Sequence, residues 1–498
     1  MKRPKTTVSL LCAGVLLTAT AVTTGLSDPA AASTCSTTPS SRVPGVTIVD
    51  PACGFTPVDG SSLYSGILQG SAYRVEVPKN WNGSLVMFAH GYAGTGTKVA
   101  VSNPQLREFY VSQGYAWAAS SYRKNGYNVG DGVQDTHDLM VHFSGITHRR
   151  APRQTYMTGL SMGGAITAVE IERYRHQFVG AMPYCGVLGG NHLFDYFLGA
   201  NATAAALTKA PLQYPQTQTA GTAYTPTFDS LIKNTVMPKL GVTTKAPGQF
   251  TTKPTKAGTQ WIDAVEQLSG GTRPGFPGAL QNYWNSFGFT PLTDIPFLFG
   301  LYPGLTGGTI GYANGNVADN TKTLYQLDGQ PGLTDAERTL NADVLRVAAT
   351  NTPTTNPART ELPDIAAKPG IPVMSLHDLG DLFVPLKMDQ IYAQQATANG
   401  QGSLFVDRAI RGTGHCEFNT PELSKAFTDL VTWVHTGTPA GGDAITNPAA
   451  VADPNFGCRY TLGSHMFFGP ACSTTTQSST RSGAGAAVAV PTRAAFTG

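Results

Sequence analysis

The sequence predicts an α/β protein in which a mainly parallel sheet is flanked by helices, and three observations support this fold class. Short apolar runs alternate with longer segments of helical periodicity over much of the chain. A serine between two glycines, at 159–163, separates one of these apolar runs from a helical segment. The alternation stops near residue 187 and resumes near residue 367, so one α/β domain is interrupted by a long insertion.

The α/β domain comprises residues 33–186 and 367–440. Apolar runs predict its strands at 73–77, 84–89, 115–120, 154–158, 178–184, 371–376 and 403–409. Helical periodicity predicts helices at 131–143, 163–174, 385–398 and 421–436. Because the carboxyl ends of parallel strands meet at one edge of a sheet, the loops after these strands are expected to form a common site.

The insertion, residues 187–366, differs in composition from its flanks. It is rich in Gly, Pro, Thr and aromatic residues, and short helices are predicted at 263–268 and 335–347. Insertions at strand carboxyl ends usually cover an active site, so we expect this segment to form a lid. Its aromatic side chains either line a substrate pocket or form the core of the insertion itself.

Both ends of the chain are expected to lie outside the α/β domain. Residues 1–32 begin with basic residues and continue with an apolar stretch and small residues, which is typical of a secretory signal peptide; an uncleaved anchor is the alternative. Residues 441–472 are expected to form a disulfide-closed appendage containing a hairpin. Residues 473–498, rich in Ser, Thr, Ala and Gly, are expected to be disordered. We therefore expect a secreted protein with no membrane anchor once the signal is removed.

The charge of the chain does not indicate nucleic acid or anionic lipid as a partner. The full chain has a net charge of +3, and residues 1–32 hold three basic residues and one acidic residue, so the remainder carries +1. Charged residues make up only 13% of the chain, so much of the surface is expected to be uncharged and polar. Neither property indicates the substrate or the oligomeric state.

Cysteine usage also favours an oxidising compartment. Cys12 falls in the predicted signal segment, and an even number of cysteines, six, remains, which predicts three disulfides. Short separations favour two pairs and leave the third: Cys35–Cys53, Cys458–Cys472 and Cys185–Cys416. A different partner for Cys416 is the alternative.

Ser161 is the predicted nucleophile. It lies at the centre of Gly159-Leu160-Ser161-Met162-Gly163, between a predicted strand and a predicted helix. In that setting a tight turn holds the serine in a strained backbone conformation, with its hydroxyl accessible to a base. Because a serine hydroxyl is a poor nucleophile until a base removes its proton, a histidine and a carboxylate are also required.

Candidates for both partners follow Ser161 in the chain. The strand at 371–376 runs into a loop that holds His377, Asp378 and Asp381, and the strand at 403–409 runs into a loop that holds His415. Both loops leave the sheet at the edge that carries Ser161. The chain order is thus Ser, then Asp, then His, as in one known group of hydrolases.

These motifs resemble those of the α/β-hydrolase superfamily. The matching pieces are His90-Gly91-Tyr92, Gly159 to Gly163, Gly380 to Pro385 and Gly414-His415, within about residues 70–186 and 370–436. The resemblance implies the α/β-hydrolase fold, with Asp381, which precedes a Val-Pro pair, as the acid and His415 as the base. Asp378 is the second choice for the acid. His377 is the competing base, expected instead to stabilise the acid's loop, and His90 is implied to be structural.

An oxyanion hole requires two backbone N–H groups directed at the developing negative charge. The resemblance implies that Met162 supplies one and that Tyr92, in the loop after 84–89, supplies the other. Tyr92 and Ala93 stand where His-Gly-Gly-Gly loops have glycines, so the Tyr92 side chain is expected to line the acyl pocket.

His415-Cys416 and the long insertion are similar to features of tannases and feruloyl esterases. Those enzymes tether the catalytic histidine through a following cysteine and carry a large lid. A bond from Cys416 to Cys185 would tie the histidine loop to the strand end beside Ser161. This chain differs from them in having Leu160, rather than a cysteine, before Ser161.

The sequence thus predicts a secreted serine hydrolase that cleaves small-molecule or polymeric carboxylic esters through an acyl-enzyme, with no cofactor. The alternative is a secreted peptidase of the same fold, similar to prolyl and tripeptidyl aminopeptidases. In that case Asp195, Asp229 or Glu266 would bind a free amino terminus. A non-catalytic binding protein that keeps the fold is a third hypothesis.

No metal site is expected. Asp135, His137 and Asp138 lie close together on a predicted helix, but the sequence offers no further ligands beside them. A solvated helix face is therefore favoured for these three residues.

Overall fold

The computed structural model describes residues 35–214, 226–246, 249–286, 295–300, 316–352, 355–356, 361–467 and 469–473. The predicted signal segment, residues 1–32, lies outside these ranges, and so does the predicted tail beyond residue 473. Among the helices within them, none has the length and apolarity needed to cross a membrane.

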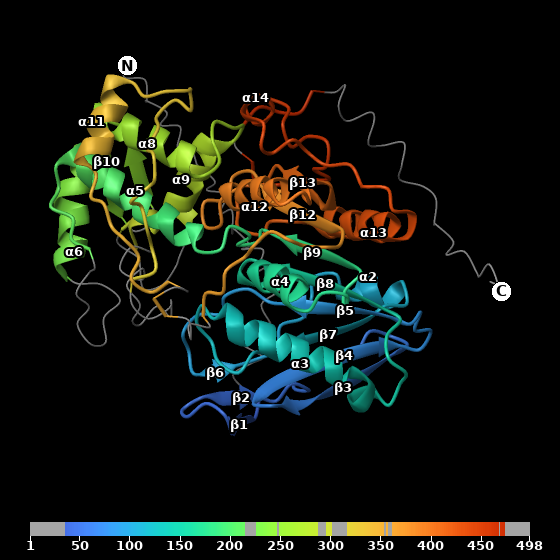
Figure 1. The fold of residues 1–498 in the computed structure, drawn as a ribbon. Coiled ribbons are helices and arrows are strands. Elements are labelled where there is room, and N and C mark those ends of the chain that lie inside the picture. The colour runs from blue at the N-terminus through green and yellow to red at the C-terminus, as the bar shows by residue number, and fades with distance from the viewer. Residues whose placement is uncertain are drawn as a thin grey trace, which may run out of the picture.

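An eight-stranded sheet forms the centre of the fold (Figure 1). Its strands, in spatial order, are β3 (Ser61–Leu68), β4 (Ser71–Pro78), β7 (Ala116–Ser120), β5 (Ser84–Ala89), β8 (Gln154–Leu160), β9 (Gly180–Tyr184), β12 (Val373–Asp378) and β13 (Phe405–Ile410). β4 is antiparallel to both of its neighbours, β3 and β7, and the remaining pairs are parallel. The predicted mainly parallel sheet is therefore confirmed.

The edge strand β3 was not predicted. Its residues are half-exposed or exposed along their whole length, so they lack the apolar run that indicates a buried strand. It pairs with β4 over eight residue pairs, from Ser61 opposite Pro78 to Leu68 opposite Ser71. The hairpin thus depends on the buried strand β4 more than on any pattern in β3 itself.

Helices cover both faces of the sheet. α3 (Val129–Thr147), α4 (Met162–Arg173) and α12 (Lys387–Ala398) pack in one core cluster with the side chains of Leu85 and Met87. α2 (Arg107–Ser112) and α13 (Thr420–Thr436) pack in a second cluster with Val86 and Phe88. Successive residues of β5 thus enter opposite cores, as the two-residue period of a strand requires.

The insertion forms a helical lobe beside the end of the sheet that carries β12 and β13 (Figure 1). Its elements are α5 (His192–Thr208), α6 (Pro226–Leu231), the π-helix 232–236, α7 (Met237–Leu240), β10 (Val242–Ala246), β11 (Gln249–Thr252), α8 (Lys256–Leu268), α9 (Phe276–Ser286), α10 (Phe297–Gly300) and α11 (Asp335–Asp343). α5 was not predicted. Because it is buried on nearly all sides, it lacks the amphipathic period that indicates a helix.

The aromatic residues of the insertion are mostly core residues. The predicted pocket or core candidates Phe194, Tyr196, Phe197, Trp261, Tyr283, Phe297 and Phe299 are all buried. Trp261 stacks on Phe299 with ring centroids 5.2 Å apart and donates its indole N–H to the Ala200 carbonyl. The side chains of Trp284, Phe287 and Phe289 lie outside the described residues.

The predicted C-terminal hairpin is wrong. The segment 453–467 and 469–473, called here the C-terminal segment, contains turns and contains no strand in its described residues. The Arg411 guanidinium, which is buried, donates to the carbonyl groups of Pro454, Phe456 and Pro470. Carbonyl groups that turn inward to one arginine are not available for a strand ladder.

Candidate active site

Ser161 lies in a sharp turn between β8 and α4. Its backbone has φ 57° and ψ −123°, a region that non-glycine residues rarely occupy. A Cβ atom on Gly159 would lie 2.2 Å from the Gly163 carbonyl oxygen, and one on Gly163 would lie 2.1 Å from the Ala89 carbonyl oxygen. Both flanking positions therefore require glycine, and the strain is concentrated at the serine.

The register of the sheet brings three loops to this turn. Ala89 pairs with Gly159, Leu160 pairs with Tyr184, and Tyr184 pairs with Leu376. Asp378 pairs with Ile410 on the neighbouring strand β13. The carboxyl ends of β5, β8, β9, β12 and β13 are thus level, so the segments that follow them meet at one edge.

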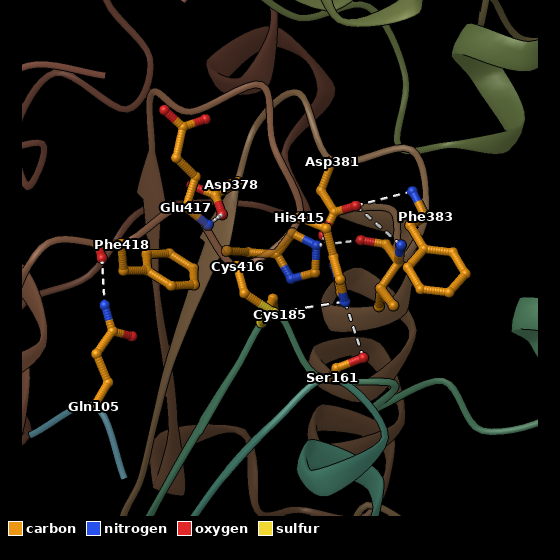
Figure 2. Close-up of a disulfide and its surroundings, with 12 residues drawn as sticks. Gln105, Ser161, Cys185, Asp378, Asp381, Phe383, His415, Cys416, Glu417 and Phe418 are labelled. Carbon is orange, nitrogen blue, oxygen red and sulfur yellow. Dashed lines mark hydrogen bonds and ion pairs between the residues drawn. A yellow bond between two sulfur atoms is a disulfide. The ribbon is translucent and has the colours of Figure 1, made fainter. Parts of the chain in front are cut away.

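Ser161, His415 and Asp381 point toward one another at this edge (Figure 2). The distance from Ser161 Oγ to His415 Nε2 is 2.9 Å, and the distance from His415 Nδ1 to Asp381 Oδ2 is 2.6 Å. With the Nδ1 proton donated to the carboxylate, Nε2 is free to accept the serine proton. Asp381 is fully buried and Ser161 is nearly so.

Asp378, the second candidate for the acid, binds elsewhere. Its Oδ2 accepts a hydrogen bond from the backbone N–H of Glu417, at 2.8 Å. Burial raises the pKa of Asp378 well above its ordinary value, and the charges of Asp381 and Glu417 raise it further. The carboxyl group of Asp378, neutral when buried in this way, therefore supports the loop that carries His415 and does not bind the His415 ring.

His377 and His90 are also buried, and their ring contacts are with residues other than Ser161. His377 pairs with Asp389 through Nδ1 and donates from Nε2 to the Val384 carbonyl, at 2.7 Å. Burial opposes the charged ring of His377, but the Asp389 carboxylate outweighs it and raises the pKa. His90 stacks on Tyr122 with centroids 4.0 Å apart, and burial lowers its pKa. Both histidines hold loops in place.

Of the predicted oxyanion-hole residues, Met162 directly follows Ser161 and Tyr92 belongs to a loop that passes beside it. Met162 is the first residue of α4, where backbone N–H groups have no partner within the helix. In the loop after β5, a Cβ atom on Gly91 would lie 3.0 Å from Ser161 Cβ, so the segment that leads into Tyr92 passes directly against the serine. Tyr92 is half-buried, and burial raises the pKa of its phenol to about 12.

The histidine loop, residues 411–417, is held by a disulfide and by a carboxylate. Cys416 is bonded to Cys185, which directly follows β9. Glu417 accepts hydrogen bonds from the N–H groups of Gly414, at 2.8 Å, and Thr413, at 3.2 Å. The structure also contains the other two pairs favoured by spacing, Cys35–Cys53 and Cys458–Cys472.

The order of the strands, the serine turn after β8, and an acid loop and a histidine loop after β12 and β13 occur together in one known architecture. The chain has the α/β-hydrolase fold. Within this fold the large insertion follows β9 and ends before β12.

Comparisons with known proteins give little information about the substrate. The chain matches no family model. It is 30% identical to an o-phthalyl amidase from Xanthobacter agilis over 74 residues, which are 15% of this chain and 16% of that enzyme.

Among solved structures, feruloyl esterase B from Aspergillus oryzae is 15% identical with a TM-score of 0.41, over 79% of this chain and 84% of the esterase. Tannin acyl hydrolase from Aspergillus niger is 14% identical with a TM-score of 0.39, over 81% and 82% of the two chains. At these scores neither similarity carries an argument about activity.

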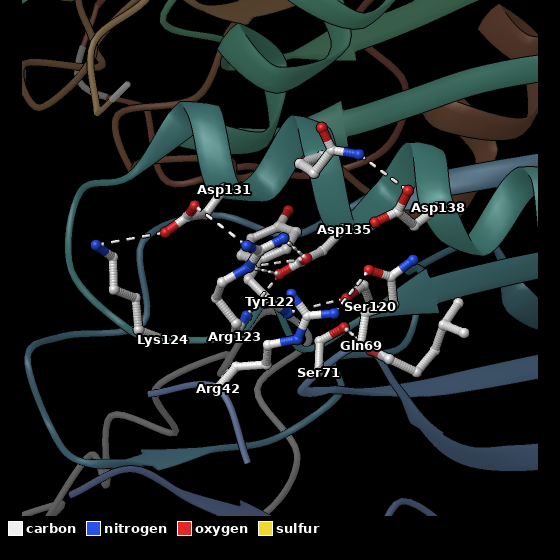
Figure 3. A network of polar contacts seen from close by, with 12 residues as sticks. Arg42, Gln69, Ser71, Ser120, Tyr122, Arg123, Lys124, Asp131, Asp135 and Asp138 are labelled. Atoms are coloured by element: carbon white, nitrogen blue, oxygen red, sulfur yellow. Dashed lines mark hydrogen bonds and ion pairs between the residues drawn. The ribbon is translucent and has the colours of Figure 1, made fainter. Parts of the chain in front are cut away.

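The acidic residues considered for a metal site have protein partners (Figure 3). Asp135 accepts hydrogen bonds from the Arg123 backbone N–H, at 2.7 Å, and from the guanidinium of Arg123. Asp138 accepts one from Gln134, at 2.9 Å, and His137 stacks on Tyr174 with centroids 3.4 Å apart. The solvated-face prediction is wrong for Asp135, which is buried.

Sequence reasoning missed two residues that contact the acid or the base, and a third that holds the histidine loop. Tyr283 donates to Asp381 Oδ1 at 2.8 Å from 98 residues away in the chain, and no motif marks it. Phe383 packs edge-on against the His415 ring, with centroids 4.9 Å apart. Glu417 could have been found, because a carboxylate two residues after a glycine-flanked histidine can accept the N–H groups of that loop.

Proposed function

We propose that this protein is a secreted serine hydrolase that cleaves carboxylic esters. The observation that carries the proposal is the continuous set of hydrogen bonds from Asp381 through His415 to Ser161, at 2.6 and 2.9 Å. A buried carboxylate, a histidine of fixed tautomer and a strained serine are the arrangement that activates a hydroxyl as a nucleophile.

In the proposed reaction, Ser161 Oγ attacks the ester carbonyl and its proton passes to His415 Nε2. The N–H groups of Met162 and Tyr92 bind the resulting oxyanion. His415 then protonates the leaving alcohol, and the acyl group stays on Ser161. A water molecule, deprotonated by His415, releases the carboxylic acid and restores the hydroxyl. Asp381 orients His415 and stabilises its charged form.

Secretion and the lid belong to the same proposal. Three disulfides fit an oxidising compartment, which agrees with a signal peptide at residues 1–32. The insertion packs against the loop that carries Asp381, because Phe297 lies edge-on to Phe383, with centroids 5.3 Å apart. We propose that it covers the site and selects the substrate.

Amide hydrolysis is the second candidate, because the 74-residue match is to an enzyme named as an amidase. For a peptidase that binds a free amino terminus, two of the three proposed acidic residues, Asp195 and Asp229, are poorly placed. Asp195 pairs with His192 at 2.9 Å and accepts the Asp319 N–H, and Asp229 pairs with Lys233 at 2.8 Å. Carboxylates that already have protein partners bind an added ammonium group less strongly.

The discriminating experiment compares p-nitrophenyl acyl esters, acyl anilides and aminoacyl anilides on the same enzyme. We expect kcat/KM for the esters to exceed that for both anilides. Faster cleavage of acyl anilides would favour an amidase, and faster cleavage of aminoacyl anilides with a free amine would favour the peptidase.

A further inference from the structure

Asp381 lies in the loop 379–384, called here the acid loop. Side chains of the insertion hold this loop by hydrogen bonds. Tyr196 donates its hydroxyl proton to the Leu382 carbonyl, at 3.2 Å, and Arg273 Nε donates to the Leu379 carbonyl, at 2.6 Å. Tyr283 donates its hydroxyl proton to Asp381 Oδ1, at 2.8 Å. All three side chains belong to the insertion and are buried.

One of these three contacts differs from the other two. Tyr196 and Arg273 bind the backbone of the acid loop, whereas Tyr283 binds the carboxylate that faces His415. Asp381 Oδ1 also accepts the N–H groups of Phe383, at 2.8 Å, and Val384, at 3.0 Å. With three donors on Oδ1, the carboxylate is held in the rotation that presents Oδ2 to His415.

The Tyr283 hydroxyl keeps its proton across the working range of pH. Burial raises the pKa of this phenol well above its ordinary value, and the charge of Asp381 raises it further. The group is therefore a permanent donor to the carboxylate, and its ring is fixed by Phe297, whose centroid lies 5.4 Å away.

We propose that Tyr283 is a positioning residue for the acid of the triad, so that the insertion takes part in catalysis as well as covering the site. The proposal rests on the proposed function, since it requires Asp381 to act through His415 on Ser161. If the insertion were displaced, Asp381 Oδ1 would therefore lose one of its three hydrogen-bond donors.

The test compares Tyr283→Phe with Tyr196→Phe as the matched control. Both variants remove one hydroxyl from a buried insertion tyrosine that touches the acid loop, but only Y283F removes a contact to the carboxylate. With p-nitrophenyl acetate we expect Y283F to lower kcat about 10-fold or more with KM changed less than about 2-fold. Y196F should keep kcat within about 2-fold.

Proton NMR supplies a readout that a purely structural role would not move. The proton in the 2.6 Å bond between His415 and Asp381 is expected to give a far-downfield signal, which should shift or broaden in Y283F and stay in place in Y196F. Should Y283F not fold, site-specific 3-fluorotyrosine at position 283 retains the ring and the donor. It should shift that signal while keeping kcat within about 2-fold of the unmodified enzyme.

Equal kcat in Y283F and the unmodified enzyme would overturn the proposal, and so would equal losses in Y283F and Y196F. An NMR signal indifferent to 3-fluorotyrosine would also overturn it. Ser161→Ala, assayed in parallel, separates the two proposals: an inactive S161A with a fully active Y283F removes only the role of Tyr283. An active S161A would remove the proposed function itself.

Discussion

The two loops that deliver Asp381 and His415 leave adjacent strands but are held by different parts of the chain. The histidine loop is tied to β9 by the Cys185–Cys416 disulfide and is capped by the C-terminal segment, whose Met466 carbonyl accepts the N–H of Thr413. The acid loop has no disulfide and is held by side chains of the insertion.

The difference shows which parts of the chain the site depends on. The serine turn is specified locally, by two glycines and the strand before it. The histidine loop depends on a covalent bond between segments 231 residues apart, and the acid loop depends on a helical lobe that a minimal α/β domain would lack. Burial lowers the pKa of Arg273 to about 10, and this buried guanidinium donates to the Leu379 carbonyl of the acid loop.

The largest effect is expected at the acid. Asp381→Asn removes the charge that fixes and stabilises His415, so we expect kcat to fall about 10⁴-fold, as in other triads. Asp378→Asn is the control, because Asp378 is buried with a raised pKa and an amide resembles its neutral carboxyl. Ester hydrolysis by D378N should stay within about 10-fold of the unmodified enzyme.

Steady-state kinetics with p-nitrophenyl acetate measure both variants. A larger loss of kcat in D378N than in D381N would contradict the assignment of Asp381 as the acid. It would also contradict the distinction drawn between the two loops.

An intermediate effect is expected at the disulfide. Replacing both Cys185 and Cys416 by serine releases the histidine loop, and small displacements of a catalytic group typically cost up to about 100-fold in rate. Stability should also fall by about 2–4 kcal/mol. The control, serine at Cys35 and Cys53, should lose stability while retaining kcat, since that bond closes the N-terminal flank.

Denaturant titrations and kcat measurements on the two double variants provide the comparison. If kcat falls equally in both, the Cys185–Cys416 bond has no special relation to His415.

The smallest effect is expected in the pH dependence of stability, through His465 in the C-terminal segment. Burial opposes the charge on His465, but the hydrogen bond with Glu422, at 2.8 Å, and the charges of Glu422 and Glu417 outweigh it and raise the pKa. A raised folded-state pKa gives stability that is complete below the ordinary value and is lost as pH rises through the folded value.

Thermal unfolding at pH 5.5 and pH 9 tests this sign. At each pH, the Tm of the unmodified protein is compared with the Tm of His465→Gln. The difference in favour of the unmodified protein should be about 1–2 °C larger at pH 5.5 than at pH 9. His435→Gln, at an exposed position at the end of α13, controls for the loss of a histidine. A difference that grows with pH would show that His465 is bound as the neutral ring.

The sequence was sufficient where a pattern is local. β5 is buried along its whole length and β8 along all but its two end residues, and α13 begins with a capping box between Asn419 and Glu422, so each could be predicted from neighbouring residues. The three disulfides followed from spacing and an even count. The serine turn could be predicted from Gly159 and Gly163. The carbonyl group of Gly163 leaves no room for a side chain on Gly159, and the carbonyl group of Ala89 leaves none for a side chain on Gly163.

Other features depend on contacts that no local pattern encodes. α5 is buried on nearly every side, so its period is hidden, and β3 is too exposed to show an apolar run. The hydrogen bond from Tyr283 to Asp381 joins a helix of the insertion to the loop after β12, across a separation of 98 residues. The C-terminal segment is held by the side chain of Arg411, among other contacts, rather than by strand pairing in its described residues.

The most direct test of the account is covalent labelling of Ser161 combined with its removal. A fluorophosphonate should add a single adduct, located by mass spectrometry on the peptide that contains Ser161, and should abolish ester hydrolysis. Ser161→Ala should resist labelling, fold normally and lose at least about 10⁴-fold in kcat. An adduct on another serine, or hydrolysis retained by S161A, would contradict the central claim that Ser161, His415 and Asp381 perform the reaction.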